Sequence, residues 1–264
     1  MDSPFDISPS VASLLRDLSA KYETADFLTG DPSWFMHQVT GRENQEAMAF
    51  IASTLSYGSR KQFMPKIQSI LDWSGGEVDA WVRDGGYEDH FHKGDSRCFY
   101  RLYNIGAMYC FFTVYRQLMA EHGSLGDYVR LQTTDGQTQG ATVSGDGMDA
   151  VTAICRYFAD HGPTAVIPKD TQSACKRVCM FLRWMVRKDS PVDLGLWSSF
   201  IDRRTLVMPL DTHVVSQSVR LGLLQTKSTS MSTARRLTER LAEVFPDDPL
   251  RGDFALFGYG VNNN

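Results

Sequence analysis

The sequence lacks an apolar stretch long enough to cross a lipid bilayer. Its longest largely apolar run, residues 105–115, is well short of the roughly 20 residues that a membrane-spanning helix needs. The first six residues are acidic and polar, unlike the basic and then apolar start of a secretory signal. We therefore expect a cytoplasmic protein with no membrane partner.

Cysteine is scarce and follows no metal-binding pattern. The five cysteines are an odd number and contain no Cys-x-x-Cys pair, which argues against a disulfide framework, a zinc ribbon and a cysteine-bound iron–sulfur cluster. The sequence also has no glycine-rich phosphate loop, no Gly-x-Ser-x-Gly elbow and no His-Glu-x-x-His helix. Hydride transfer, phosphoryl transfer and hydrolysis by a catalytic triad therefore have no support in the sequence.

Two groups of residues could bind a metal ion, and we expect neither to do so. The Asp-His-Phe-His segment at residues 89–92 is flanked by glycine, where solvent-exposed polar side chains are the simpler interpretation. Cys175 and Cys179, one helical turn apart, could meet His213, but cysteines with this spacing are usually small core residues. The sequence thus predicts no metal site and no cofactor.

The sequence has no large excess of charge of either sign, because its formal net charge is −4 over 264 residues. The average hides an asymmetry: residues 1–150 hold 12 basic and 20 acidic side chains, whereas residues 151–264 hold 15 and 11. Five basic residues fall within 13 positions that contain no acid: Lys176, Arg177, Arg183, Arg187 and Lys188. This local basic face is compatible with binding to a phosphate backbone, and a solvated helix face explains it equally well.

The spacing of apolar residues is typical of an all-α protein, since no alternating pattern persists long enough to build a sheet. Thr40 and Glu43 predict a capping box at the start of a helix that ends at Gly58. Further helices are predicted at residues 63–71, 98–118, 212–221, 232–245 and 254–259, and loops at residues 85–86 and 132–147.

The most informative segment is a helix predicted to begin at Ser173, its N-cap, and to stop before Pro191. Five apolar residues at helical spacing form a stripe: Val178, Phe181, Leu182, Met185 and Val186. Four others project together from the opposite face: Lys176, Met180, Arg183 and Arg187. Lys176 would lie in the first turn, close to several positive charges, and both features favour a neutral amine that can attack carbon. The alternative is a lysine that is solvated or faces a phosphate.

Two aspartates precede predicted helices. Asp211 is placed to cap the helix at residues 212–221, and Asp253 the helix at residues 254–259. Capping alone would explain Asp211, but a cap also holds the carboxylate rigidly beside any cationic transition state that forms there.

Residues 173–178 (Ser-Ala-Cys-Lys-Arg-Val) and 209–213 (Pro-Leu-Asp-Thr-His) resemble the lysine-bearing hairpin and downstream Pro-x-Asp of the helix-hairpin-helix DNA glycosylases. The 35-residue separation of lysine and aspartate is closer to that of the archaeal-type 8-oxoguanine DNA glycosylase/AP lyases. The block Ala-Cys-Lys-Arg-x-x-Met-Phe-Leu-Arg-Trp-Met-Val-Arg at residues 174–187 also resembles the signature of a widespread bacterial family of hypothetical proteins. This second likeness extends over most of the chain.

The glycosylase resemblance implies a role for each matching residue. Lys176 would be the nucleophile that attacks C1′ of a damaged nucleoside, and Asp211 would stabilise the oxocarbenium-like transition state. Four residues would form the base pocket: Tyr57, Met180, Asp253 and Phe257. Four others would bind the DNA: Ser173, Arg177, Arg183 and Arg187.

The chain also departs from that family. Residues 172–175 (Gln-Ser-Ala-Cys) replace the hairpin glycines whose amides, with a bound cation, hold a phosphate in many relatives. Phe257 stands where archaeal-type relatives can have a tryptophan, so it has no indole N–H to offer to a base. The first difference removes support for a cation, and the second leaves the preferred base open.

The resemblance implies a helix-hairpin-helix glycosylase-like fold of two helical lobes, with the active site between them. We expect one domain over residues 1–264, with a central lobe at about 59–205 and a second lobe formed by 1–58 and 206–264. We predict a monomeric base-excision enzyme that removes an oxidised purine, 8-oxoguanine foremost, from double-stranded DNA in the cytoplasm, at the nucleoid. The alternatives are a non-catalytic nucleic-acid-binding protein on this scaffold and a glycosylase for another lesion.

Overall fold

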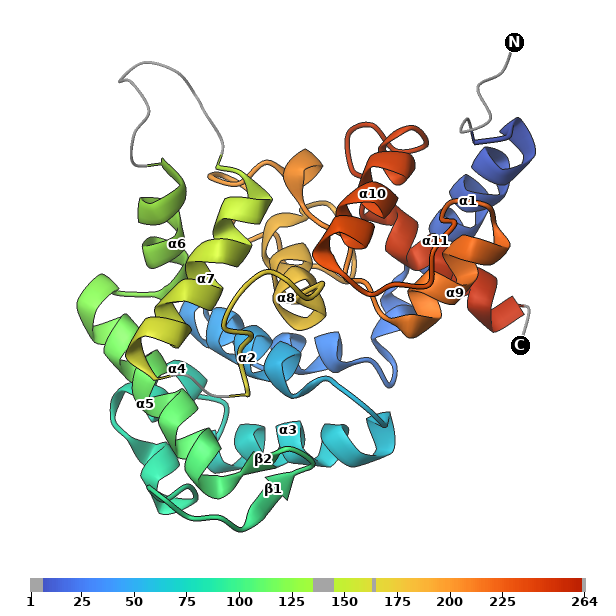
Figure 1. The fold of residues 1–264 in the computed structure, drawn as a ribbon. Coiled ribbons are helices and arrows are strands. Elements are labelled where there is room, and N and C mark those ends of the chain that lie inside the picture. Colours follow the sequence, from blue (N-terminus) through green and yellow to red (C-terminus); the bar gives the residue numbers. More distant parts are fainter. Residues whose placement is uncertain (1–6, 135–144, 163–164, 263–264) are drawn as a thin grey trace.

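The computed structural model describes residues 7–134, 145–162 and 165–262, and these residues are predominantly helical, as predicted (Figure 1). The α-helices are α1 (Pro9–Tyr22), α2 (Arg42–Leu55), α3 (Arg60–Ser74), α4 (Val78–Arg83), α5 (Ile105–His122), α6 (Leu125–Thr134), α7 (Gly147–His161), α8 (Lys176–Val186), α9 (Thr212–Arg220), α10 (Met231–Ala242) and α11 (Arg251–Asn262). Short 3-10 helices lie at Ala25–Leu28 (η1), Pro32–His37 (η2), Gly86–Asp89 (η3) and Arg203–Thr205 (η4), and one antiparallel hairpin joins β1 (Cys98–Tyr100) to β2 (Tyr103–Asn104). Within the described ranges no helix combines the length and the apolar character needed to span a membrane.

Helices from the two ends of the chain pack together. In Figure 1, α1 lies beside α11, and α9 lies against α11, on the side of the molecule away from α4, α5 and α6. By contrast, α2 packs against α3, α4 and α8. It also packs against η2, so α2 contacts both the predicted second lobe, to which the boundary at residue 58 assigns it, and helices of the predicted central lobe.

A core of aromatic rings packs against the apolar stripe of α8. Phe50 of α2 contacts rings from three other helices: Phe111 and Tyr115 of α5, Phe158 of α7, and Phe181 of α8. The whole predicted apolar stripe of α8 is buried. Because protein interiors are close-packed, this contact fixes the direction of the opposite face of α8.

Two predicted helix starts in the first half of the chain are wrong. The N-cap of α2 is Gly41, with φ +87°, and no side chain caps the helix, so Thr40 does not form the predicted capping box. The helix predicted over residues 98–118 begins at Ile105, because Cys98–Asn104 forms the β-hairpin instead. Arg101, at φ +50°, makes the reversal between the two strands.

Two predicted starts near the site are also wrong. The N-cap of α8 is Cys175, in a left-handed conformation with φ +44° and without a side-chain cap, whereas Ser173 forms a β-bridge with Ser230. Helix α11 begins at Arg251, so Asp253 lies inside its first turn rather than before it. The predicted loop at residues 132–147 falls for its greater part outside the described residues.

Two of the four residues predicted to lie opposite the apolar stripe of α8 are buried. Arg183 and Arg187 are only 3% and 1% exposed. Arg187 pairs with Asp248 at 2.9 Å, with Glu23 at 2.6 Å and with the buried Asp193, which Arg183 also contacts at 3.3 Å. The prediction that these two arginines bind DNA is therefore wrong, because acidic residues from distant segments enclose both guanidinium groups.

Candidate active site

The site is built around an ion pair between two helix starts. Lys176 is the first residue of α8, and its Nζ lies 2.8 Å from Oδ2 of Asp211. Asp211 is the N-cap of α9, as predicted, and its Oδ1 accepts hydrogen bonds from the backbone N–H groups of His213 and Val214, both at 2.9 Å. The cap therefore fixes one carboxylate oxygen and leaves the other for the amine.

The charge state of Asp211 follows from its surroundings. Burial alone would raise the pKa of this carboxyl, but the charge and hydrogen bond of Lys176 and the Val214 amide together lower it below its ordinary value. The carboxylate is thus ionised at neutral pH and faces a positive group. Any attack by the Lys176 amine therefore requires that its proton first moves to an acceptor in the site.

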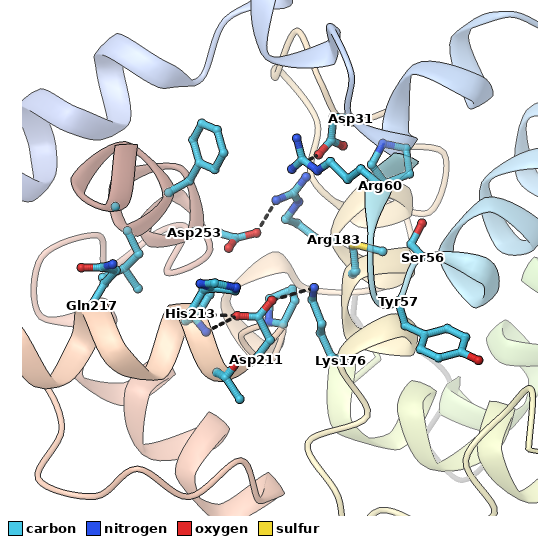
Figure 2. Close-up of a pocket in the computed structure, with 18 of the residues that line it drawn as sticks. Asp31, Ser56, Tyr57, Arg60, Lys176, Arg183, Asp211, His213, Gln217 and Asp253 are labelled. Carbon is cyan, nitrogen blue, oxygen red and sulfur yellow. Dashed lines mark hydrogen bonds and ion pairs between the residues drawn. The ribbon is translucent and has the colours of Figure 1, made fainter. Parts of the chain in front are cut away.

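Both residues line one cavity of about 600 Å³ (Figure 2). It is bounded by α8, α9, α11, the segment of η1 and η2, and the loop between α2 and α3. The structure brings together there all six residues predicted as catalytic or base-pocket groups: Tyr57, Lys176, Met180, Asp211, Asp253 and Phe257. These residues are up to 200 positions apart in sequence, so the fold alone makes them neighbours.

The far wall of the cavity combines a charged pair with aromatic rings. Asp253 is ion-paired with Arg183, yet burial dominates and raises the pKa of Asp253 above its ordinary value. Phe257 contacts Phe27 and Tyr22 edge to face, with ring centroids 4.9 and 5.8 Å apart. This wall offers an apolar surface with a single acidic group, a lining suited to a flat heterocycle.

Sequence reasoning did not assign several polar residues to this cavity, among them Asp31, Arg60, Gln217 and His213, which it considered only as a metal ligand. Asp31 and Arg60 pair at 3.3 Å at one end of it, and His213 and Gln217 lie on α9. His213 and Gln217 are four residues apart, so helical periodicity could have placed them on one face once Asp211 was recognised as the cap. Asp31 and Arg60 come from separate segments, and no local pattern connects them.

The other two predicted DNA-binding residues lie beside a second, shallower cavity of about 320 Å³. Ser173 and Arg177 line it, together with Lys176 and Asp211. The guanidinium of Arg177 donates to the Thr54 carbonyl at 2.7 Å and to the Tyr103 hydroxyl, so it is already engaged inside the protein. Of the four predicted DNA-binding residues, only Ser173 is exposed.

The hairpin between β1 and β2 reaches the edge of the main cavity. The N–H of Leu102 donates to the hydroxyl of Tyr57 at 3.1 Å, and the Arg101 guanidinium lies 5.5 Å from the centroid of the Tyr57 ring. Gly58 permits this approach, because a Cβ there would lie 2.7 Å from an Arg101 nitrogen. The side chain of Leu102 is left 79% exposed at the tip.

Neither considered metal site is assembled. Within the described ranges no group of three or more histidine, cysteine or acidic side chains is placed to hold an ion. His90 instead stacks on Trp73 at 3.9 Å, and Cys175 and Cys179 are buried.

Comparison with known proteins assigns the chain to a family. The model of the family described as "Protein of unknown function (DUF2400)" matches residues 31–262. The chain belongs to this family. The matched range includes Lys176, Asp211 and all four predicted pocket residues, so the site lies within the region that defines the DUF2400 family. Searches of curated proteins and of solved structures found no match.

Proposed function

We propose that this protein is a DNA glycosylase with AP lyase activity, which removes an oxidised purine, 8-oxoguanine foremost, through an imine on Lys176. The observation that carries the proposal is the 2.8 Å approach of Lys176 Nζ to Asp211 Oδ2 inside one cavity. The two-lobed helix-hairpin-helix architecture and the location at the nucleoid belong to the same proposal. It rests on the resemblance of residues 173–178 and 209–213 to those enzymes, together with this geometry.

The proposed reaction proceeds in four steps. The deprotonated Lys176 amine attacks C1′, and the C1′–N bond breaks with its electron pair leaving on the base. The base takes up a proton, and Nζ, now bonded to C1′, gives one up. Ring opening gives a protonated imine between C1′ and Nζ, while O4′ takes up a proton. Removal of a C2′ proton then expels the 3′-phosphate by β-elimination. Asp211 would stabilise the positive charge that develops at C1′, and its position as a helix cap holds it ready for that role.

The cavity has the size and lining for an extruded base. Its volume of about 600 Å³ lies within the range of about 300–1000 Å³ typical of small-molecule sites. Phe257 and Met180 supply apolar surface for a base face, and Asp253 can accept hydrogen bonds from a base edge. The loss of stacking in the duplex would be offset by these contacts and by contacts to phosphate.

Exposed basic residues beside the cavity support the proposal of a duplex DNA substrate, although they are not the residues that the sequence predicted. Arg60 and Lys61 begin α3 and are exposed, and Arg101 is exposed at the hairpin tip. Leu102, beside Arg101, is an exposed apolar group of the kind that proteins insert between base steps. We therefore assign phosphate contacts to these three basic residues in place of Arg183 and Arg187.

Borohydride trapping tests the proposal directly, because borohydride reduces an imine to a stable amine. The protein is mixed with duplex DNA containing 8-oxoguanine, and we expect a covalent adduct that Lys176→Gln abolishes. The matched control is Lys188→Gln, since Lys188 is exposed just beyond the same helix, and this variant should form the adduct normally.

The two alternatives give different results. Salt-sensitive DNA binding without an adduct on any damaged base would refute catalysis and favour a binding protein. An adduct on another lesion in a panel of modified bases, but not on 8-oxoguanine, would refute the assigned substrate and retain the chemistry.

A further inference from the structure

Gln217 is the one cavity residue whose buried polar atom has no partner. Across the described residues, three buried side-chain atoms lack a hydrogen bond: Ser19 Oγ, Trp184 Nε1 and Gln217 Oε1. Of these three residues, only Gln217 lines the cavity. The residue is only 6% exposed, and its unpaired atom is the amide oxygen, whereas the amide nitrogen lies on the cavity side in Figure 2.

An unpaired amide in this position disfavours the empty protein. A buried polar group without a partner loses its hydrogen bonds to water, whereas an apolar side chain of similar length would avoid that loss. Native proteins pair nearly all such groups, so an exception at a site calls for an explanation. A ligand that pairs with the amide explains it.

The room for such a ligand is the cavity of about 600 Å³ that Gln217 lines. Gly260 of α11 lies opposite the amide, and a Cβ there would make ordinary van der Waals contact with it at 3.4–3.6 Å. In Figure 2, Gln217 and Tyr57 lie at opposite ends of the cavity, with the pair of Lys176 and Asp211 between them. A sugar held at that pair can therefore direct its base toward Gln217, on the side of the cavity that also carries Asp253.

We propose that Gln217 is a specificity-determining residue that reads the edge of the extruded base, an inference that rests on the proposed function. Its amide offers one donor and one acceptor side by side. The complementary edge is a lactam, in which an N–H group adjoins a carbonyl. Oxidised and 6-oxo purines carry such an edge, and adenine does not. Rotation about the last side-chain torsion, which is broad for glutamine, brings Oε1 round to the ligand.

The test separates reading of the base from chemistry at the sugar. Single-turnover rates are measured for excision of 8-oxoguanine and for cleavage at a preformed abasic site, which has no base. We expect Gln217→Met, of similar length and apolar, to slow excision about ten- to a hundredfold and to leave abasic-site cleavage unchanged. Gln217→Glu, which retains an acceptor but loses the donor, should also slow excision alone. The matched control, Gln225→Met, changes an exposed glutamine outside the cavity and should alter neither rate.

Each other result has a definite meaning. Excision by Gln217→Met at the wild-type rate, with normal abasic-site cleavage, overturns the inference and leaves the proposed function standing. Equal loss of both activities in a folded variant shows that Gln217 supports α9 rather than the base, and also overturns it. Failure of the wild-type protein to act on either substrate refutes the proposed function, and this inference with it.

Discussion

Replacing Asp211 separates its two roles, as a helix cap and as a charge beside Lys176. Asparagine keeps an oxygen that can accept from the amides of His213 and Val214, because asparagine caps helices as well as aspartate does. It removes the negative charge that lies 2.8 Å from the Lys176 amine. Alanine removes both the cap and the charge.

The expected magnitudes follow from exposure and geometry. Loss of the cap in Asp211→Ala lowers the free energy of unfolding by about 1 kcal/mol. The side chains of Lys176 and Asp211 are 36% and 29% exposed, so solvent screens the pair and its loss contributes about 0–1 kcal/mol. The melting temperature should therefore fall by about 2–8 °C in Asp211→Ala and by less than about 4 °C in Asp211→Asn.

Activity should follow a different order from stability. Both variants lack the charge that, in the proposed mechanism, stabilises the transition state, so each should form the borohydride adduct about 10²–10³-fold more slowly. Calorimetry and trapping rates on the same samples measure the two effects. Full activity in Asp211→Asn, or equal destabilisation by asparagine and alanine, would refute the division of roles.

The ion pair also predicts a pH dependence. Because the pKa of Asp211 is lowered in the folded protein, its stabilising effect is complete above the unfolded value near 3.9. That effect is lost as the pH falls through the lower folded value. As the pH falls below about 5, the free energy of unfolding should therefore decrease less in Asp211→Asn than in the wild type.

Two further changes test the surface and the interior. Leu102→Ala should slow excision from duplex DNA about tenfold and leave excision from single-stranded DNA unchanged, because only in a duplex must a base pair be separated. If the variant and the wild type excise from the duplex at equal rates, this role for the hairpin tip is contradicted. Arg187→Ala leaves Asp193, Asp248 and Glu23 without their shared cation, so the free energy of unfolding measured in urea should fall by about 3–5 kcal/mol. An unchanged urea midpoint would show that the buried network contributes no stability.

Local patterns were sufficient to place Lys176 and Asp211 each at the start of a helix, although not to predict that they meet. The apolar stripe of α8 and the cap of α9 are signals within a few residues, and they correctly placed Lys176 in a first turn and Asp211 before a helix. The meeting of the two groups could be predicted only from the resemblance, because nothing in the 34 residues between them determines a distance.

Distant partners explain what the sequence could not predict. Arg183 and Arg187 have the spacing of a solvated face, and their burial depends on Asp193, Asp248 and Asp253, which come from other segments. Residues 98–104 were predicted to be helical from their apolar composition. They form the β-hairpin instead, because the conformation of this segment depends on contacts with Tyr57. In both cases tertiary contacts override the local pattern.

The packing of α1 along α11 affects how the protein is made. At about 5–20 residues per second, a ribosome needs about 10–50 s to add the residues that separate these two helices. Throughout that interval α1 lacks α11, against which it packs extensively, and the cavity lacks the wall that carries Asp253 and Phe257. A nascent chain therefore cannot complete the cavity around the Lys176 amine until its last helix has been synthesised.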